Sequence, residues 1–263
     1  MNNAAHKAEP AHRSREALLV WCAFFLLAVL LNGTIPFFLG ADLHAWTESA
    51  VKTILFAFVF YAVLFLAIPL ILLKGWRTVR QPAFLIPLGI AMLSITAWHF
   101  FRWAAAIVVA VLAYLHWCYN LSDYGIRSRG WRVDLLAILL IGLLALIPLL
   151  IGRSLDALTP GVAFLAGLNR LFANPASTVE NLFYFGFLTE QLSHRAGKWL
   201  TPLLIGLMYA AHEMTNPEYW YGEMNFALIF VGIAIWAAIY LWRRSAIVIW
   251  LGDGLYRFMG SLF

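Results

Sequence analysis

The sequence predicts an all-α polytopic membrane protein with eight or nine transmembrane helices, and three observations favour this class. Of the 263 residues, 63% are hydrophobic and only 12% are charged, whereas charged residues make up about 25% of a soluble domain. The mean hydropathy is +0.81, and the apolar residues fall in blocks close to the length of about 20 residues that crosses a bilayer. Lysines and arginines gather at alternate ends of these blocks, as the positive-inside rule predicts.

Nine apolar runs are expected to form the helices. The first follows the polar segment "MNNAAHKAEPAHRSRE" and is too long for a signal peptide, so we interpret it as an uncleaved span. The third and fourth runs are separated only by "WHFFRW", and one long tilted helix over both is the alternative. The runs cover residues 17–41, 51–73, 83–99, 102–119, 133–152, 177–194, 199–213, 224–242 and 245–262.

The basic residues favour nine crossings. With a cytoplasmic N-terminus, 13 of the 18 lysines and arginines fall on the cytoplasmic side, and Glu213, Glu218 and Glu223 share an outer loop. Merging residues 83–119 into one helix would destroy this asymmetry. The long segment "GRSLDALTPGVAFLAGLNRLFANPAS" has amphipathic spacing and is expected to lie along the membrane interface.

Composition also argues against several partners and cofactors. The net charge of +5 could indicate nucleic acid, but in a membrane protein lysine and arginine report topology first, so the expected partners are membrane lipids and membrane-embedded proteins. Cys22 and Cys118 lie in separate apolar runs and have no metal-binding spacing. The stretch "HEMTN" has Asn216 where a zinc protease has its second histidine. We therefore predict no metal and no cofactor.

Ionisable side chains within the predicted spans concentrate in the C-terminal third. Charges are costly in a bilayer and mark either functional sites or ion pairs. The distance along each span from the basic residue at its cytoplasmic end, at about 1.5 Å per residue, gives the depth of a side chain. Glu180, His212 and Arg257 then lie at a common depth of roughly 20–22 Å, and Asp253 lies at roughly 13 Å. One shared polar site is expected, although ion pairs that merely hold the helices together are the alternative.

A glutamate and a histidine at one level suit general acid–base hydrolysis. A buried carboxyl group can take a proton from water and return it to a leaving group, while a histidine or arginine stabilises the oxyanion. Other membrane-protease chemistries lack their residues, since Asp253 is the one aspartate expected to be well buried and no GxSxG motif is present. The pattern favours a water-activating peptidase without a covalent intermediate.

The C-terminal part resembles the CPBP intramembrane proteases, the CAAX-processing and bacteriocin-processing family also called Abi. The family's motifs are EExxxR, FxxxH and HxxxN on successive helices. Here "ENLFYFGFL" stands at the first and "MYAAH" at the second, and "LSDYGIRSRGWRVDLLAILL" is similar to the segment before the core. The resemblance implies a protease core over residues 120–263, with residues 1–119 as an N-terminal addition, in a prokaryotic plasma membrane.

By this resemblance Glu180 is the water-activating base and His212 stabilises the oxyanion. The supporting positions are rewritten: Asn181 replaces the second glutamate, and Asp253 and Arg257 replace the histidine and asparagine of the third motif. Arg257 is expected either to stabilise the oxyanion or to neutralise Glu180, and Asp253 to orient His212.

Two other positions also depart from the family pattern. Phe185 replaces the arginine of the first motif, and Met208 replaces the phenylalanine of the second. A rival alignment on Glu190 of "EQLSHR" fits the first motif with one change, but it places the glutamate near the cytoplasmic edge.

Two functions follow from these residues. The first is a glutamate-dependent intramembrane endopeptidase, a hydrolase acting on a membrane-embedded peptide or protein. The alternative is a catalytically inactive relative, a scaffold or subunit that binds a partner membrane protein. A transporter is not favoured, because neither inverted halves nor paired broken helices are visible.

Overall fold

The structure is a computed structural model and describes residues 10–34, 50–100, 103–128, 130–147, 159–215 and 226–262. Within these ranges the chain forms helices and no strand, so the all-α prediction is confirmed for them. Glu218 and Glu223, which were predicted to lie in an outer loop, and Asn216 fall outside the described residues.

The N-terminal half of the chain consists, in its described part, of apolar helices. Helix α1 continues into a π-helical turn η1, and α4, η2 and α5 run on without a break as one rod. The helices are α1 (Pro10–Val29), η1 (Leu30–Thr34), α4 (Ala50–Leu55), η2 (Phe56–Ala67), α5 (Ile68–Lys74), α6 (Trp76–Val79), α7 (Pro82–Thr96), η3 (Trp98–Phe100) and α8 (Ala104–Tyr119). Helices α7 and α8 are separate and pack together, as the prediction of two helices over residues 83–119 requires.

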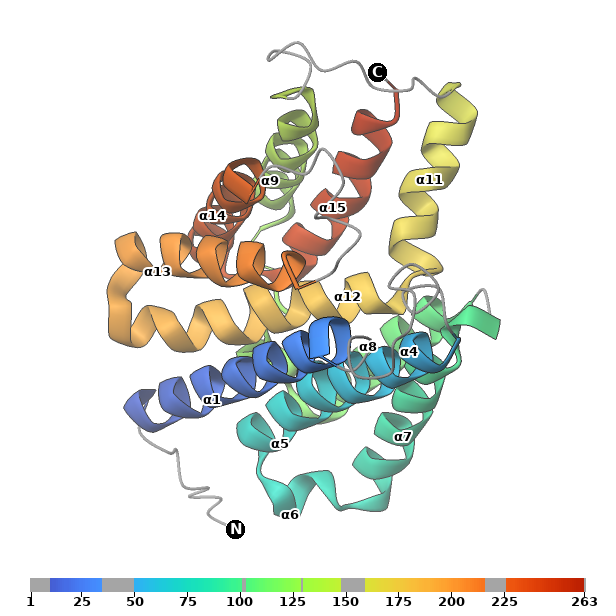
Figure 1. Cartoon of the computed structure of the whole chain (residues 1–263), viewed down its shortest axis with the longest axis vertical. Coiled ribbons are helices and arrows are strands. Elements are labelled where there is room, and N and C mark those ends of the chain that lie inside the picture. The colour runs from blue at the N-terminus through green and yellow to red at the C-terminus, as the bar shows by residue number, and fades with distance from the viewer. Residues whose placement is uncertain are drawn as a thin grey trace.

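The C-terminal half contains every predicted site residue. Its helices are η4 (Leu121–Tyr124), α9 (Trp131–Leu143), η5 (Leu144–Leu146), α11 (Pro160–Phe172), α12 (Pro175–Asn181), η6 (Leu182–Leu188), α13 (Thr189–Glu213), α14 (Phe226–Arg243) and α15 (Ala246–Gly260). Gly197, with φ of 72°, interrupts α13. The chain reverses there, so that α13 consists of the two separate helices that the runs 177–194 and 199–213 predict (Figure 1).

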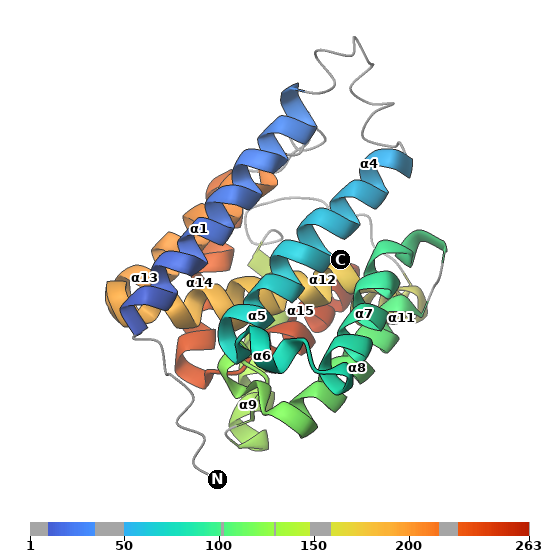
Figure 2. The same ribbon diagram turned by 90° about the horizontal axis from the view of Figure 1, so that it is seen from below.

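The helix made of α12, η6 and the first part of α13 lies at the centre of the molecule. Helices α1, α5, α7 and α8 pack on one side of it, and α9, α14, α15 and α11 lie on the other (Figure 1, Figure 2). Side chains all along this central helix are buried, from Pro175 to Thr189. The sequence places its polar residues on this helix, so they lie in the middle of the bundle.

Large apolar side chains cover the outside of the bundle. Leu19 is 68% exposed, Leu93 71% and Leu165 62%. Among the described residues three helices are long and apolar enough to cross a membrane: Arg13–Asn32, Thr53–Lys74 and Phe226–Arg243. An apolar exterior on such helices is the property of a membrane protein, because lipid replaces water around it.

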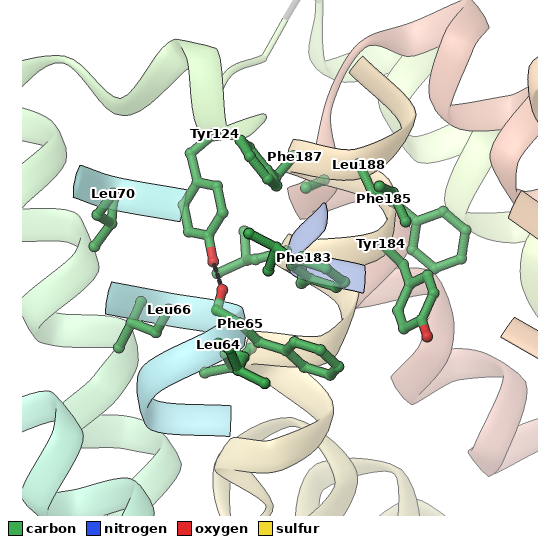
Figure 3. Packing of buried hydrophobic residues seen from close by; sticks show 14 of the residues in the cluster. Leu64, Phe65, Leu66, Leu70, Tyr124, Phe183, Tyr184, Phe185, Phe187 and Leu188 are labelled. Atoms are coloured by element: carbon green, nitrogen blue, oxygen red, sulfur yellow. Dashed lines mark hydrogen bonds between the residues drawn. The ribbon is translucent and has the colours of Figure 1, made fainter. Parts of the chain in front are cut away.

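Segment 120–128 is wedged against the central helix by a close backbone contact. A Cβ atom on Gly186 would lie 2.2 Å from the carbonyl oxygen of Tyr124, and one on Gly125 would lie 2.8 Å from the Gly186 Cα. The Tyr124 hydroxyl donates to the Phe65 carbonyl in η2, and Phe183 packs beside them (Figure 3). The backbone amide of Ala246 donates to the Gly125 carbonyl at 2.8 Å. This crossing ties η2, the central helix and α15 together.

The substitution Gly186→Ala should lower the thermal unfolding temperature in detergent. The new methyl group meets backbone, which cannot rotate away, and overpacking of this kind costs about 1–3 kcal/mol. Gly232→Ala in α14 is the matched control, because nothing lies within 4 Å of its added Cβ. The control should match or exceed the wild type, since alanine favours a helix. Equal unfolding temperatures for both variants would contradict the close contact.

Candidate active site

Glu180 and His212 face each other in the core of the bundle. Glu180 lies at the end of α12, and His212 lies near the end of α13, one helix further along the chain. Glu180 Oε1 is 3.5 Å from His212 Nδ1, and the two residues are 8% and 9% exposed. The structure therefore brings together the two residues predicted to be catalytic.

Neither of these two atoms has a hydrogen-bond partner within the described part of the chain. A separation of 3.5 Å is longer than the 2.7–3.2 Å of an ordinary N–H···O bond. Buried polar atoms are normally paired, and an unpaired one in a native structure marks a place for water, a ligand or chemistry. A water molecule about 2.8 Å from both atoms would satisfy each of them.

Aromatic rings surround the imidazole. The Phe24 ring of α1 meets the His212 ring edge-on at 4.6 Å between centroids, and the Tyr184 ring is nearly parallel to it at 5.9 Å. The Tyr209 ring lies at 5.7 Å, and the Tyr209 side chain also interacts with the Glu180 carboxyl group. Packing on several sides fixes the ring orientation, so that Nδ1 points toward Glu180.

The first half of the chain contributes directly to this site. Besides the contact of Phe24 with His212, Trp21 Nε1 donates to the Tyr184 hydroxyl at 3.2 Å, and the Phe65 ring stacks on Phe183 at 4.1 Å. Side chains of α1 and η2, which belong to the segment 1–119 predicted as an addition to a protease core, thus form one wall of the site.

Asp253 does not orient His212, in contrast to the prediction. Its Oδ2 atom accepts hydrogen bonds from Ser177 Oγ at 2.7 Å, Asn181 Nδ2 at 3.0 Å and Arg170 Nε at 3.0 Å. Asp253 is therefore bound to α12 and α11 rather than to α13. Asn181, the other rewritten position on α12, is its direct partner.

Arg257 lies outside this cluster. Its side chain is exposed, whereas Asp253, four residues earlier on the same helix, is 4% exposed. The expectations that Arg257 stabilises an oxyanion or neutralises Glu180 are therefore not supported by the geometry. Phe185, at the position of the family's arginine, is buried and packs near Trp236, with 6.0 Å between the ring centroids.

Arg170 is the residue that sequence reasoning missed. It belongs to the segment expected along the membrane interface, of which residues 160–172 form α11, and α11 packs lengthwise against α15 (Figure 1). The signal was present in the sequence "AGLNRLF", where a single arginine lies three residues after Gly167 on an amphipathic helix. A lone arginine of this kind is ordinarily interpreted as one that extends to the interface.

The rival alignment on Glu190 corresponds to a different cluster. Glu190 Oε2 accepts from Arg127 at 3.1 Å, Arg244 at 2.8 Å and the Tyr240 hydroxyl at 3.0 Å. A carboxylate with three donors at one oxygen is held in an ion-pair network, in contrast to the unpaired Oε1 of Glu180. The structure therefore gives Glu190 a structural role at the end of the bundle where the sequence places the basic loops.

Comparisons with known proteins identify no relative of this chain. No family model matches the chain, and no curated protein and no solved structure matches it either.

Proposed function

We propose that the protein is a glutamate-dependent intramembrane endopeptidase of the CPBP type, in which Glu180 activates water and His212 stabilises the oxyanion. The observation that carries this proposal is the buried pair of unpartnered atoms, Glu180 Oε1 and His212 Nδ1, 3.5 Å apart. Two helices deliver a proton acceptor and a potential donor to one point. This is the minimum that hydrolysis without a covalent intermediate requires.

The proposed reaction has two proton transfers. Glu180 takes a proton from water as the water oxygen attacks the carbonyl carbon of the scissile peptide bond. His212, with its proton on Nδ1, donates a hydrogen bond to the resulting oxyanion. The carbonyl then re-forms, the C–N bond breaks, and Glu180 passes the proton to the leaving amine. Water is consumed, and an acid and an amine are released.

The membrane arrangement is part of the same proposal. Eight or nine helices cross a prokaryotic plasma membrane, with the N-terminus in the cytoplasm, and the substrate is a peptide or protein within that membrane. The sidedness rests on the basic residues of the loops. The contacts of Glu190 with Arg127 and Arg244 agree with it, because they gather residues assigned to the cytoplasmic side.

A non-catalytic scaffold is the second candidate, and two placements favour it. Phe185 stands where the first family motif has an arginine, and Arg257 is exposed rather than buried with Glu180. Within the part of the chain that the structure describes, no lysine or arginine forms an ion pair with Glu180, and Arg170 interacts with it only at longer range. In this reading the buried pair binds a polar group of a partner membrane protein.

Incubation of the purified full-length protein with membrane proteins tests the proposal. The protein is placed in liposomes with membrane proteins extracted from the source cells, and new N-termini are labelled and identified by mass spectrometry. We expect specific N-termini that accumulate with time and are missing from a heat-denatured sample. If none accumulate, while chemical cross-linking captures one membrane protein on the native chain, the scaffold reading replaces the peptidase.

A further inference from the structure

Helix α12 is bound to α15 at positions that flank Glu180. Ser177 and Asn181 are four residues apart, so they lie on one face of α12, and both donate to Asp253 Oδ2. Between them Thr178 Oγ1 accepts from Trp250 Nε1 at 3.2 Å. Anchors one turn apart on one face fix the rotation of a helix about its axis. Glu180 lies about 100° around the axis from Asn181, and its direction is set by that rotation.

Arg170 supplies the charge that keeps Asp253 in place. Its Nε atom lies 3.0 Å from the Oδ2 atom that accepts from Ser177 and Asn181. A buried carboxylate is stable only when it is paired and hydrogen-bonded. The ion pair therefore fixes the position of the Oδ2 atom, which accepts from both donors of α12.

Glycines on both sides of Asp253 let neighbouring helices approach α15 closely. A Cβ atom on Gly254 would lie 2.6 Å from Leu171 of α11, and one on Gly252 would lie 2.7 Å from Ile141 of α9. A Cβ atom on Gly167 of α11 would lie 2.8 Å from the Gly254 carbonyl oxygen. Small residues of this kind allow tight helix packing in membranes. The contact between α11 and α15 thus brings Arg170 to Asp253 through backbone packing.

We propose that Asp253, held by Arg170, is a positioning residue that sets the rotation of α12 and so directs Glu180 toward His212. That this positioning serves catalysis rests on the proposed function, because Glu180 and His212 are the reacting groups there. The positioning of α12 by Asp253 does not itself require that the protein cleave a substrate. Asp253 is within hydrogen-bonding distance of Ser177, Asn181 and Arg170, and it acts on Glu180 through the helix.

The test measures the surroundings of His212 directly. Full-length protein labelled with ¹⁵N-histidine is studied by NMR in detergent micelles, and the His212 signals are assigned by their loss in His212→Gln. Glu180→Gln gives the spectrum of His212 without its carboxylate neighbour. We expect Asp253→Asn to shift the His212 signals in the same direction as Glu180→Gln.

Two further variants separate positioning from general stability. Ser177→Ala leaves the ion pair intact but removes one anchor of α12, so it should produce a smaller shift of the same sign. The exchange Asn181→Asp with Asp253→Asn returns a carboxylate to the contact and should restore the wild-type signals. The exchange also serves if Asp253→Asn alone fails to fold.

Asp134→Asn is the matched control. It alters a buried carboxylate in a different cluster, where Asp134 accepts from Arg243 at 2.8 Å, and should leave the His212 signals in place. Unchanged His212 signals in both Asp253→Asn and Ser177→Ala would overturn the inference, as would an equal shift in Asp134→Asn. Because no cleavage is measured, absence of peptidase activity would overturn the proposed function while leaving this result standing.

Discussion

Replacing Glu180 by glutamine should abolish cleavage while the protein still folds and inserts. Glutamine has nearly the same shape but cannot accept the proton of the attacking water. General-base catalysis contributes about 10²–10⁴-fold to a rate, so the appearance of new N-termini should fall by at least about 100-fold. The measurement is the initial rate of N-terminus formation per folded protein in liposomes.

The same substitution should leave the thermal unfolding temperature equal to that of the wild type or raise it. Glu180 Oε1 is buried without a hydrogen-bond partner in the described chain, and a neutral amide is less costly than a carboxylate in such surroundings. Residues kept for function often lower stability in this way. If Glu180 is catalytic, Glu180→Gln should therefore lose activity without losing stability.

Glu190→Gln is the control and should behave in the reverse manner. It changes a glutamate on the same continuous helix, but one whose carboxylate accepts from Arg127, Arg244 and Tyr240. Its loss should lower the unfolding temperature and leave the rate per folded molecule near that of the wild type. Equal rates for wild type and Glu180→Gln would remove the peptidase proposal.

The positions of the helices could be predicted because apolar runs and their polar boundaries are local features. The reversal at Gly197 illustrates this. The predicted runs 177–194 and 199–213 meet at "RAGK", and Gly197 adopts a positive φ that other residues rarely tolerate. Glu180 and His212 could be paired for a similar reason, since counting along two successive helices gives their depth.

The depth of a residue in the membrane, however, does not predict how its helix is rotated about its axis or which neighbouring helix its side chain contacts. Asp253 and Arg257 share a helix face by spacing, yet one turn, about 5.4 Å, separates a residue buried against α12 from one that is exposed. Arg170 was missed for a related reason. Its partner is 83 residues away in the sequence, and only the packing of α11 on α15 reveals the pair.

The substitution Asp134→Ala should cause the largest loss of stability. Asp134 Oδ1 accepts from Arg243 Nε at 2.8 Å, and the Asp134 and Arg243 side chains are only 10% and 9% exposed. Ser128 Oγ donates to the other carboxylate oxygen. Removing one partner of a buried ion pair leaves a charge without compensation and costs about 3–5 kcal/mol. Reversible unfolding in mixed micelles, followed by tryptophan fluorescence, measures this difference.

The double replacement Asp134→Leu with Arg243→Met distinguishes this cost from a loss of packing. Apolar side chains of similar size often replace a buried ion pair with little change or a gain in stability, so the double variant should be much closer to the wild type than Asp134→Ala. Asp123→Ala provides the exposed control, because Asp123 lies 4.0 Å from Lys74 and is 60% exposed. An exposed pair contributes about 0–1 kcal/mol. If Asp134→Ala and Asp123→Ala lower stability equally, the connection between α9 and the end of α14 does not depend on the buried charge pair.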